Sequence, residues 1–358
     1  MTIVDAVAEP LPAAVIDLAA LRHNVAHLTR LIAPAETMLA VKADAYGHGL
    51  LPIAEAGLEA GATSLAVLEI SAGLVLRRAG IDVPLLAWLH GRDTDWRAGI
   101  EADIELGVSA LWQLEAIAAA GADRPAVVHL KVDTGLSRNG ATREEWPGLI
   151  RAALELQDAG ALHIRGAWSH LADASIADDE AALAEFRDAV AEAEQLGARF
   201  EVLHLAASSA GIRMPEARFD FVRFGIAAYG FSPFDDSTGA ELGLVPVMRL
   251  EAPVTEVHVG GTTLARLGIG YADGVPTLGI AKTSVQLGGR RCQVVEVAAD
   301  SMLVEAGQHR IEVGDTAILF GPGTHGEPTA EKYADWAETI ADEMVTGVAA
   351  RVPRVYVN

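Results

Sequence analysis

Residues 38–49 read MLAVKADAYGHG, in which four apolar residues lead directly into Lys42 and a polar turn that ends in glycine. A helix pattern begins near Leu50. A short apolar run that is followed by a glycine-containing turn and a helix is typical of a buried strand in an α/β unit. In such a unit, Lys42 lies at the carboxyl end of the strand.

The alternation of strand-like and helix-like segments continues from Thr37 to about Phe224. The helix patterns include Leu111–Ala120, Glu144–Gln157 and Asp178–Leu196. The candidate strands are Thr37–Val41, Ser64–Glu69, Pro84–Leu89, Asp103–Val108, Ala126–Val132, Leu162–Trp168, Val202–Ala206 and Phe219–Arg223. Strands that alternate with helices are parallel, and about eight such units in ~200 residues favour a (β/α)8 barrel of the TIM type over an open sheet.

After Gly230 the pattern changes to short β-type runs that are separated by glycine turns. The predicted strands are Val247–Val259, Thr262–Gly270, Ser284–Leu287, Cys292–Ala298, Met302–Glu305, Arg310–Val313, Thr316–Phe320 and Val352–Val357. One helix is predicted over Lys332–Val345, and Ser232–Gly243 has the composition of a linker. We therefore expect a barrel over residues 1–235 and a mainly β C-terminal domain over residues 236–358.

Composition excludes several classes of protein. A net charge of −22 disfavours nucleic acid and anionic membrane surfaces as partners. No apolar run is long enough to span a bilayer, and Met1–Pro10 lacks the features of a signal peptide. Cys292 is the only cysteine, so no internal disulfide can form. These features favour a cytoplasmic enzyme.

Lys42 is the first candidate for chemistry. A lysine at the mouth of a barrel can form a Schiff base with an aldehyde cofactor when its surroundings lower its pKa. For an isolated lysine at a strand end, however, a plain surface position is the commoner case. Other polar residues follow strand-like runs or occupy turns, in the segments Lys131–Gly140, Trp168–His170, His204–Ala210, Val222–Ile226, Gly270–Gly274 and Arg351–Tyr356.

Together with residues 40–49, these segments resemble, in the same order, the motifs of the alanine racemase family. The resemblance implies a pyridoxal-phosphate enzyme that acts on a small amino acid, with no metal, and a homodimer with shared active sites. It implies that Lys42 carries the cofactor and that Lys42 and Tyr271 are the two catalytic bases, with Tyr271 supplied by the partner subunit. The other implied cofactor-binding residues are Tyr46, His170, Ser208, Arg223, Gly225 and Ile226, and the implied substrate-binding residues are Arg138, Ala299 and Asp300.

These residue types suit racemisation, which removes a proton from one face of a carbon and returns one to the other. Racemisation therefore needs two acid–base groups, one on each face of the carbon, and the pKa of each group must lie within reach of the working pH. A tyrosine qualifies when nearby positive charge lowers its pKa, and the resemblance places His170 beside Tyr271. It also places Arg223 against the pyridine nitrogen, where an arginine, which does not give up its proton, keeps that nitrogen unprotonated and limits side reactions.

The chain departs from the family pattern at Ala207, Ala299 and Ala350, and Lys131 matches a lysine that is carbamylated in some members. The smaller side chain at Ala299 leaves room for a larger substrate. The resemblance as a whole still favours a racemase of alanine that serves D-alanine and cell-wall synthesis. The alternatives are a racemase of serine or another amino acid, a decarboxylase on the same fold, and a catalytically impaired paralogue that only binds the cofactor.

Overall fold

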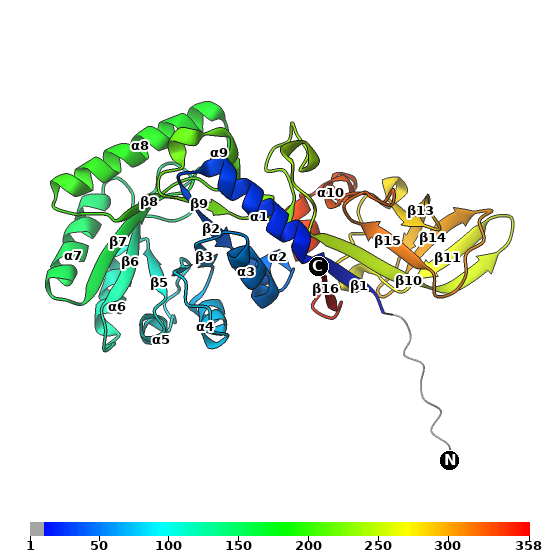
Figure 1. Cartoon of the computed structure of the whole chain (residues 1–358), viewed down its shortest axis with the longest axis horizontal. Helices are drawn as coiled ribbons and strands as arrows, with labels where there is room; N and C mark the ends of the chain where they lie inside the picture. Colours follow the sequence, from blue (N-terminus) through cyan, green and yellow to red (C-terminus); the bar gives the residue numbers. More distant parts are fainter. Residues whose placement is uncertain (1–10) are drawn as a thin grey trace, which may run out of the picture.

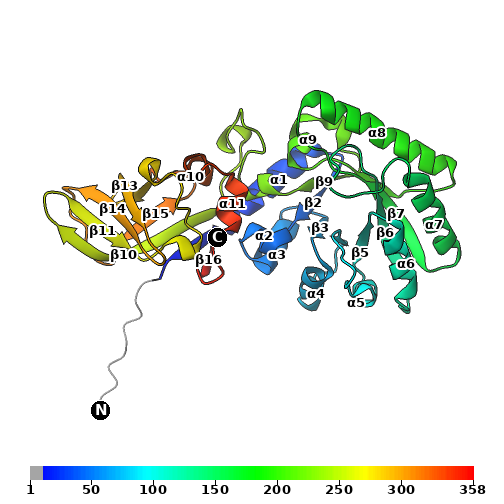
Figure 2. The same ribbon diagram turned by 180° about the vertical axis from the view of Figure 1, so that it is seen from behind.

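The computed structural model describes residues 11–358 and shows two lobes that are joined by α1 and β10 (Figures 1 and 2). The segment Met1–Pro10, for which a signal peptide is not expected, lies outside the described residues. No helix within residues 11–358 is both long and apolar enough to cross a membrane.

The first lobe is the predicted barrel. Its parallel strands lie in the order β8-β7-β6-β5-β4-β3-β2-β9, and the N–H of Asp220 donates to the carbonyl of Leu203 at 3.1 Å to close β8 against β9. All the candidate barrel strands are confirmed. They are β2 (Glu36–Ala40), β3 (Ser64–Val67), β4 (Leu85–Ala87), β5 (Glu105–Val108), β6 (Ala126–Lys131), β7 (Leu162–Trp168), β8 (Val202–His204) and β9 (Phe221–Phe224).

Helices surround this sheet because each buries one apolar stripe against it. In α1 (Leu18–Ile32) the buried residues Leu21, Val25, Leu28 and Ile32 recur at helical spacing, and the Asp17 side chain caps the helix by accepting from the Ala20 N–H at 2.9 Å. The others are α3 (Leu50–Glu59), α4 (Ile70–Arg78), α5 (Trp96–Glu101), α6 (Leu111–Ala119), α7 (Trp146–Asp158), α8 (Ile176–Gln195) and α9 (Ser208–Arg213).

The second lobe is mainly β, as predicted. It contains β10 (Met248–Val259), β11 (Thr263–Leu267), β12 (Ser284–Leu287), β13 (Arg290–Val297), β14 (Met302–Gly307), β15 (Thr316–Phe320) and β16 (Arg354–Val357). Two predictions are wrong. Residues 310–313 form no strand, and the single helix over Lys332–Val345 is two helices, α10 (Ala330–Ala337) and α11 (Ala341–Thr346). Glu338, in a left-handed conformation, separates them.

One strand of the second lobe comes from the start of the chain. β1 (Ala13–Asp17) pairs antiparallel with β10 and parallel with β16, so residues far apart in sequence lie side by side. The sequence pattern does not predict β1, which lies outside the repeated strand–helix units and whose two pairing partners lie more than two hundred residues away. As a result, the chain enters the barrel from the second lobe.

Candidate active site

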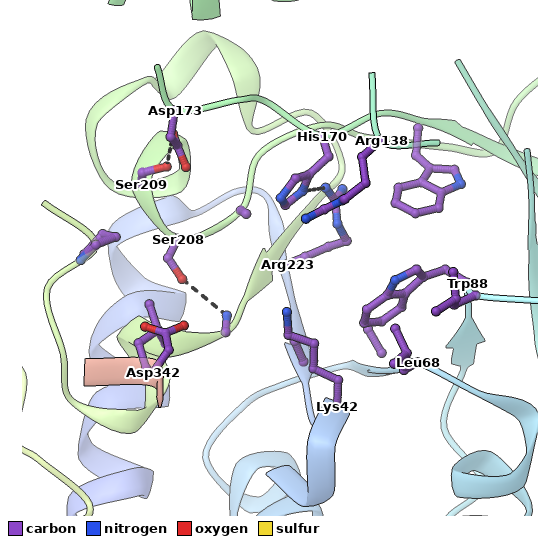
Figure 3. Close-up of a pocket in the computed structure, with 18 of the residues that line it drawn as sticks. Lys42, Leu68, Trp88, Arg138, His170, Asp173, Ser208, Ser209, Arg223 and Asp342 are labelled. Carbon is purple, nitrogen blue, oxygen red and sulfur yellow. Dashed lines mark hydrogen bonds between the residues drawn. The ribbon is translucent and has the colours of Figure 1, made fainter. Parts of the chain in front are cut away.

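The mouth of the barrel holds a cavity of about 460 Å³. It lies at the carboxyl ends of the strands, where barrel enzymes place their active sites. The predicted site residues that line it are Lys42, Tyr46, Arg138, His170, Ser208, Arg223, Gly225 and Ile226. Figure 3 shows Lys42 and Arg223 extending into this space from opposite sides.

Lys42 leaves β2 through a turn with a rare backbone. Ala43, Asp44, Ala45 and Tyr46 all have φ between 52° and 54°, a left-handed conformation that costs an L-residue roughly 1–2 kcal/mol. The Asp44 carboxylate accepts from the N–H of Leu50 at 2.8 Å and ties the turn to α3. Strain of this kind persists where the surrounding structure enforces it, and it clusters at functional sites.

The Lys42 amine has a lowered pKa. Burial is the main cause, the positive charge of Arg138 adds to it, and the carboxylate of Asp342 opposes it. A lysine whose pKa falls has more of its amine in the neutral, nucleophilic form. The amine therefore suits both covalent attachment of an aldehyde and proton transfer.

A cradle for an anion lies at one end of the cavity. The Ser208 hydroxyl accepts from the N–H of Gly225 at 3.3 Å, and helical turns begin at Ser208 and at Ile226. A Cβ on Gly225 would lie 2.3 Å from the Tyr46 hydroxyl oxygen, so only glycine allows this approach. Burial raises the pKa of Tyr46, which keeps its hydroxyl protonated as a hydrogen-bond donor.

Arg223 is a buried cation held from several directions. Its Nη2 donates to the carbonyls of Ser169 at 2.8 Å and Leu205 at 2.9 Å, and its guanidinium contacts Nδ1 of His170 and of His204, each at 3.0 Å. Burial lowers its pKa to about 9, which leaves the guanidinium charged at neutral pH. It therefore presents a fixed positive charge to the cavity.

His170 is neutral. Burial and the nearby cations, Arg223 first among them, lower its pKa to about 2. Its Nδ1 faces Arg223, which has no acceptor atom, so Nδ1 accepts and Nε2 carries the hydrogen. His170 therefore adds no positive charge to the cavity.

Lys131 adds a second lysine with an altered pKa. Its amine contacts Asn139 and lies 4.6 Å from the centre of the Trp168 ring. Burial, Arg223 and Arg138 lower its pKa to about 7. It is therefore partly neutral at physiological pH, and a neutral amine is the form in which a lysine can be carbamylated.

The remaining predicted residues, Tyr271, Ala299 and Asp300, lie together in the second lobe and do not line the cavity of their own chain. The N–H of Tyr271 donates to the Ala298 carbonyl and that of Ala272 to the Ala299 carbonyl, both at 2.9 Å. The Tyr271 side chain is 54% exposed. These residues form one turn of the second lobe, and the Tyr271 side chain is exposed there.

Several residues that line the cavity were not predicted from the sequence, and three of them stand out. Asp342, from α11, lines the cavity to one side of Lys42, and Asp173 contacts Ser209 near the anion cradle (Figure 3). Trp88 forms part of the wall that faces Lys42. Asp342 sits in an ordinary helix pattern and carries no sequence signal of its role. Trp88 lies inside the predicted strand Pro84–Leu89 and Asp173 lies in the loop that follows β7, so neither position marks a role in the sequence.

The cavity residues fit pyridoxal phosphate. The ligand needs an amine for its aldehyde, donors for its phosphate and a partner for its ring nitrogen. Lys42 offers the amine, the Ser208–Gly225–Tyr46 cradle offers the donors, and Arg223 offers a buried donor.

A closed barrel with a lysine, a buried arginine and an anion cradle at its mouth, followed by a mainly β lobe, defines a barrel-type enzyme of pyridoxal-phosphate chemistry. The sequence model described as "Alanine racemase, N-terminal domain" matches residues 16–233, and "Alanine racemase, C-terminal domain" matches residues 253–356. This chain belongs to the alanine racemase family.

Individual relatives agree with this assignment over nearly the whole chain. The alanine racemase of Beutenbergia cavernae is 42% identical over 96% of this chain and 97% of its own length, and that of Streptomyces coelicolor is 44% identical over 96% and 95%. The crystal structure of the alanine racemase from Streptomyces lavendulae superposes with a TM-score of 0.94 at 39% identity and covers 97% of each chain. The predicted family, fold class and racemase type of enzyme are confirmed, and the alternatives, a racemase of serine or another amino acid or an impaired paralogue, are not favoured.

Proposed function

We propose that this chain interconverts L- and D-alanine with pyridoxal phosphate bound at the barrel mouth. The observation that carries the proposal is the convergence of Lys42, Arg223 and the Ser208–Gly225–Tyr46 cradle on one cavity of about 460 Å³. The names of the relatives support alanine as the substrate.

Each part of the cavity has one task in this proposal. When bound, pyridoxal phosphate supplies an aldehyde that captures an amino group and a ring that withdraws electrons from the substrate α-carbon. Lys42 holds the aldehyde end, while Ser208, Tyr46 and the backbone N–H groups of Gly225 and Ile226 hold the phosphate. Arg223 faces the ring nitrogen and keeps it unprotonated because the guanidinium retains its own hydrogens.

In this proposal, two side chains on opposite faces of the substrate remove and return the α-proton. Lys42 takes or returns the α-proton on one face of the substrate through its amine, whose pKa is lowered by burial. Tyr271 serves the other face. Because Tyr271 is exposed and does not line the cavity of its own chain, we assign it to the cavity of a second copy, in a homodimer with two shared sites. Arg138 and the partner subunit's Ala299 and Asp300 then surround the substrate carboxylate.

His170 has a supporting part. Its neutral ring accepts from Arg223 through Nδ1 and directs Nε2–H elsewhere in the cavity. The positive charges of the cavity on that side then come from Arg138 and Arg223. A cytoplasmic location and a role in D-alanine supply for the cell wall belong to the same proposal.

The test is hydrogen exchange during turnover. Purified protein loaded with pyridoxal phosphate is incubated with L-alanine in deuterated water, and optical rotation and Cα–H signals are followed together. We expect loss of rotation with deuterium incorporation, and neither in Lys42→Ala. A panel that includes L-serine measures specificity. Faster turnover of serine than of alanine would overturn the substrate, and release of carbon dioxide would overturn the reaction class.

A further inference from the structure

A continuous line of buried polar side chains runs inside the barrel behind Arg223. Nη1 of Arg223 lies 3.0 Å from Nδ1 of His204, Nε2 of His204 lies 2.9 Å from Nδ1 of His129, and Nε2 of His129 lies 2.8 Å from a carboxylate oxygen of Glu105. The other Glu105 oxygen contacts Arg165. His204 and His129 are 0% and 1% exposed, and Glu105 is 8% exposed.

The line crosses the sheet from strand to strand. Glu105 lies on β5, His129 on β6, His204 on β8 and Arg223 on β9. The contact between the two histidines must therefore pass over β7, which separates β6 from β8. At that point β7 carries Gly166, where a Cβ would lie 2.7 Å from Nδ1 of His129. The missing side chain leaves the space that this contact needs.

The two ends of the line permit only one arrangement of hydrogens. Arg223 can only donate, so Nδ1 of His204 accepts and the hydrogen of a neutral His204 sits on Nε2. That hydrogen is donated to Nδ1 of His129, whose own hydrogen then sits on Nε2 and is donated to the Glu105 carboxylate. A charged His129 would force His204 to turn a hydrogen toward Arg223, which would break the first link.

Burial supports the neutral form of both imidazoles. It lowers the pKa of His129 to about 3 and that of His204 well below its ordinary value. The other basic groups that line the cavity with Arg223 are Arg138, which is charged, and Lys42 and Lys131, whose pKa values are lowered, and the acids are Asp173 and Asp342. A buried guanidinium needs compensation for its lost hydration, and polarised hydrogen bonds strengthen one another in a buried chain.

We infer that Glu105, His129 and His204 are positioning residues, which act as a fixed-tautomer relay that holds Arg223 against the cavity. Through the relay, the charge of Glu105 makes Nδ1 of His204 a stronger acceptor for Arg223, although two imidazole rings separate the carboxylate from the guanidinium. It transfers no proton, because the guanidinium stays protonated at neutral pH. The importance of the relay for turnover rests on the proposed function, whereas its hydrogen pattern does not.

The first experiment needs neither cofactor nor activity. ¹⁵N NMR of histidine-labelled protein distinguishes Nδ1–H, Nε2–H and doubly protonated rings. We expect His129 and His204 both as Nε2–H throughout the neutral range. A hydrogen on Nδ1 of His204, or a doubly protonated His129 at neutral pH, would overturn the relay even if the protein proved to be an active racemase.

The second experiment removes the charge at the far end. In Glu105→Gln we expect kcat to fall about tenfold, the scale of one charge-assisted hydrogen bond, with KM nearly unchanged and the visible absorbance band of the bound cofactor shifted. Glu201→Gln is the control for the loss of a nearby carboxylate. Glu201 contacts Arg165 at 3.8 Å and His163 at 2.6 Å and raises the pKa of His129 through its charge, but the ring nitrogens of His129 contact His204 and Glu105 instead. We therefore expect Glu201→Gln to keep the tautomers of His129 and His204 and to change kcat much less than Glu105→Gln does. If Glu105→Gln keeps the unmutated kcat and absorbance band, or if Glu201→Gln changes them to the same extent, the inference fails.

Discussion

A mixing experiment tests whether each active site needs two chains. Lys42→Ala removes the amine from the barrel half-site, and Tyr271→Phe removes the phenol from the half-site in the second lobe. Because Tyr271 does not line the cavity of its own chain, the two substitutions damage different halves. In a mixed dimer, one site then carries both defects and the other carries none.

The expected recovery follows from counting sites. Random pairing of equal amounts of two chains makes about half of the dimers mixed, and each mixed dimer has one intact site of two. The mixture should regain about one quarter of the activity of the same amount of unmutated protein. The double variant Lys42→Ala/Tyr271→Phe is the control in the other direction. When mixed with an equal amount of unmutated chain, it should halve the activity of that chain.

The assay is polarimetric turnover of L-alanine after the chains have been unfolded together, refolded and loaded with pyridoxal phosphate. Each single variant alone sets the background. If the mixed variants show only the sum of their separate activities, and the double variant does not reduce the activity of the unmutated chain, then each site lies within one chain. The assignment of Tyr271 to the partner's cavity would then be refuted.

Three further predictions concern the cavity. Gly225→Ala should lower cofactor affinity and melting temperature, because its Cβ would lie 2.3 Å from the Tyr46 hydroxyl oxygen. Adding Tyr46→Phe to the same chain should recover part of the lost melting temperature. If the two substitutions lowered the melting temperature additively, the predicted clash would be contradicted. Lys131 has a pKa lowered from 10.5 to about 7, so the folded state binds fewer protons than the unfolded state and its burial cost grows as pH falls from 10.5 to 7. The free energy of unfolding of the apoprotein, measured between pH 7 and 10.5, should therefore rise less steeply with pH in Lys131→Met than in the unmutated protein. An equal slope in both proteins would contradict the lowered pKa of Lys131. Asp342→Asn should move the acidic limb of the kcat profile to lower pH, because the Asp342 carboxylate raises the pKa of Lys42; a limb that stays in place would show that Lys42 does not set it.

Local sequence patterns predict much of the part of the candidate site that the barrel contributes. Short apolar runs alternate with helix patterns, and in a parallel barrel the residues just after each run meet at one mouth. The positions of Lys42, Ser208 and Arg223 along the chain therefore suffice to predict that they lie near one another. The resemblance to a family then assigned their roles.

Other features depend on contacts between segments that are far apart in the sequence, which a local pattern cannot predict. β1 becomes a strand because β10 and β16 lie on either side of it. Asp342 reaches the cavity because α11 is a separate helix and not the continuation of α10. Tyr271 is predicted as catalytic, yet its distance from the cavity of its own chain emerges only when the two lobes are seen together.

The relay residues show most clearly what the sequence determines and what only the tertiary structure decides. The sequence by itself places Glu105, His129, His204 and Arg223 in or beside four strands, and single histidines in strands are usually ordinary buried residues. Their alignment depends on strand register, on the closure of β8 against β9 and on the missing side chain of Gly166. Side-chain periodicity determines which residues face inward, but a hydrogen bond needs atoms within about 3 Å, and only the packed barrel sets that distance.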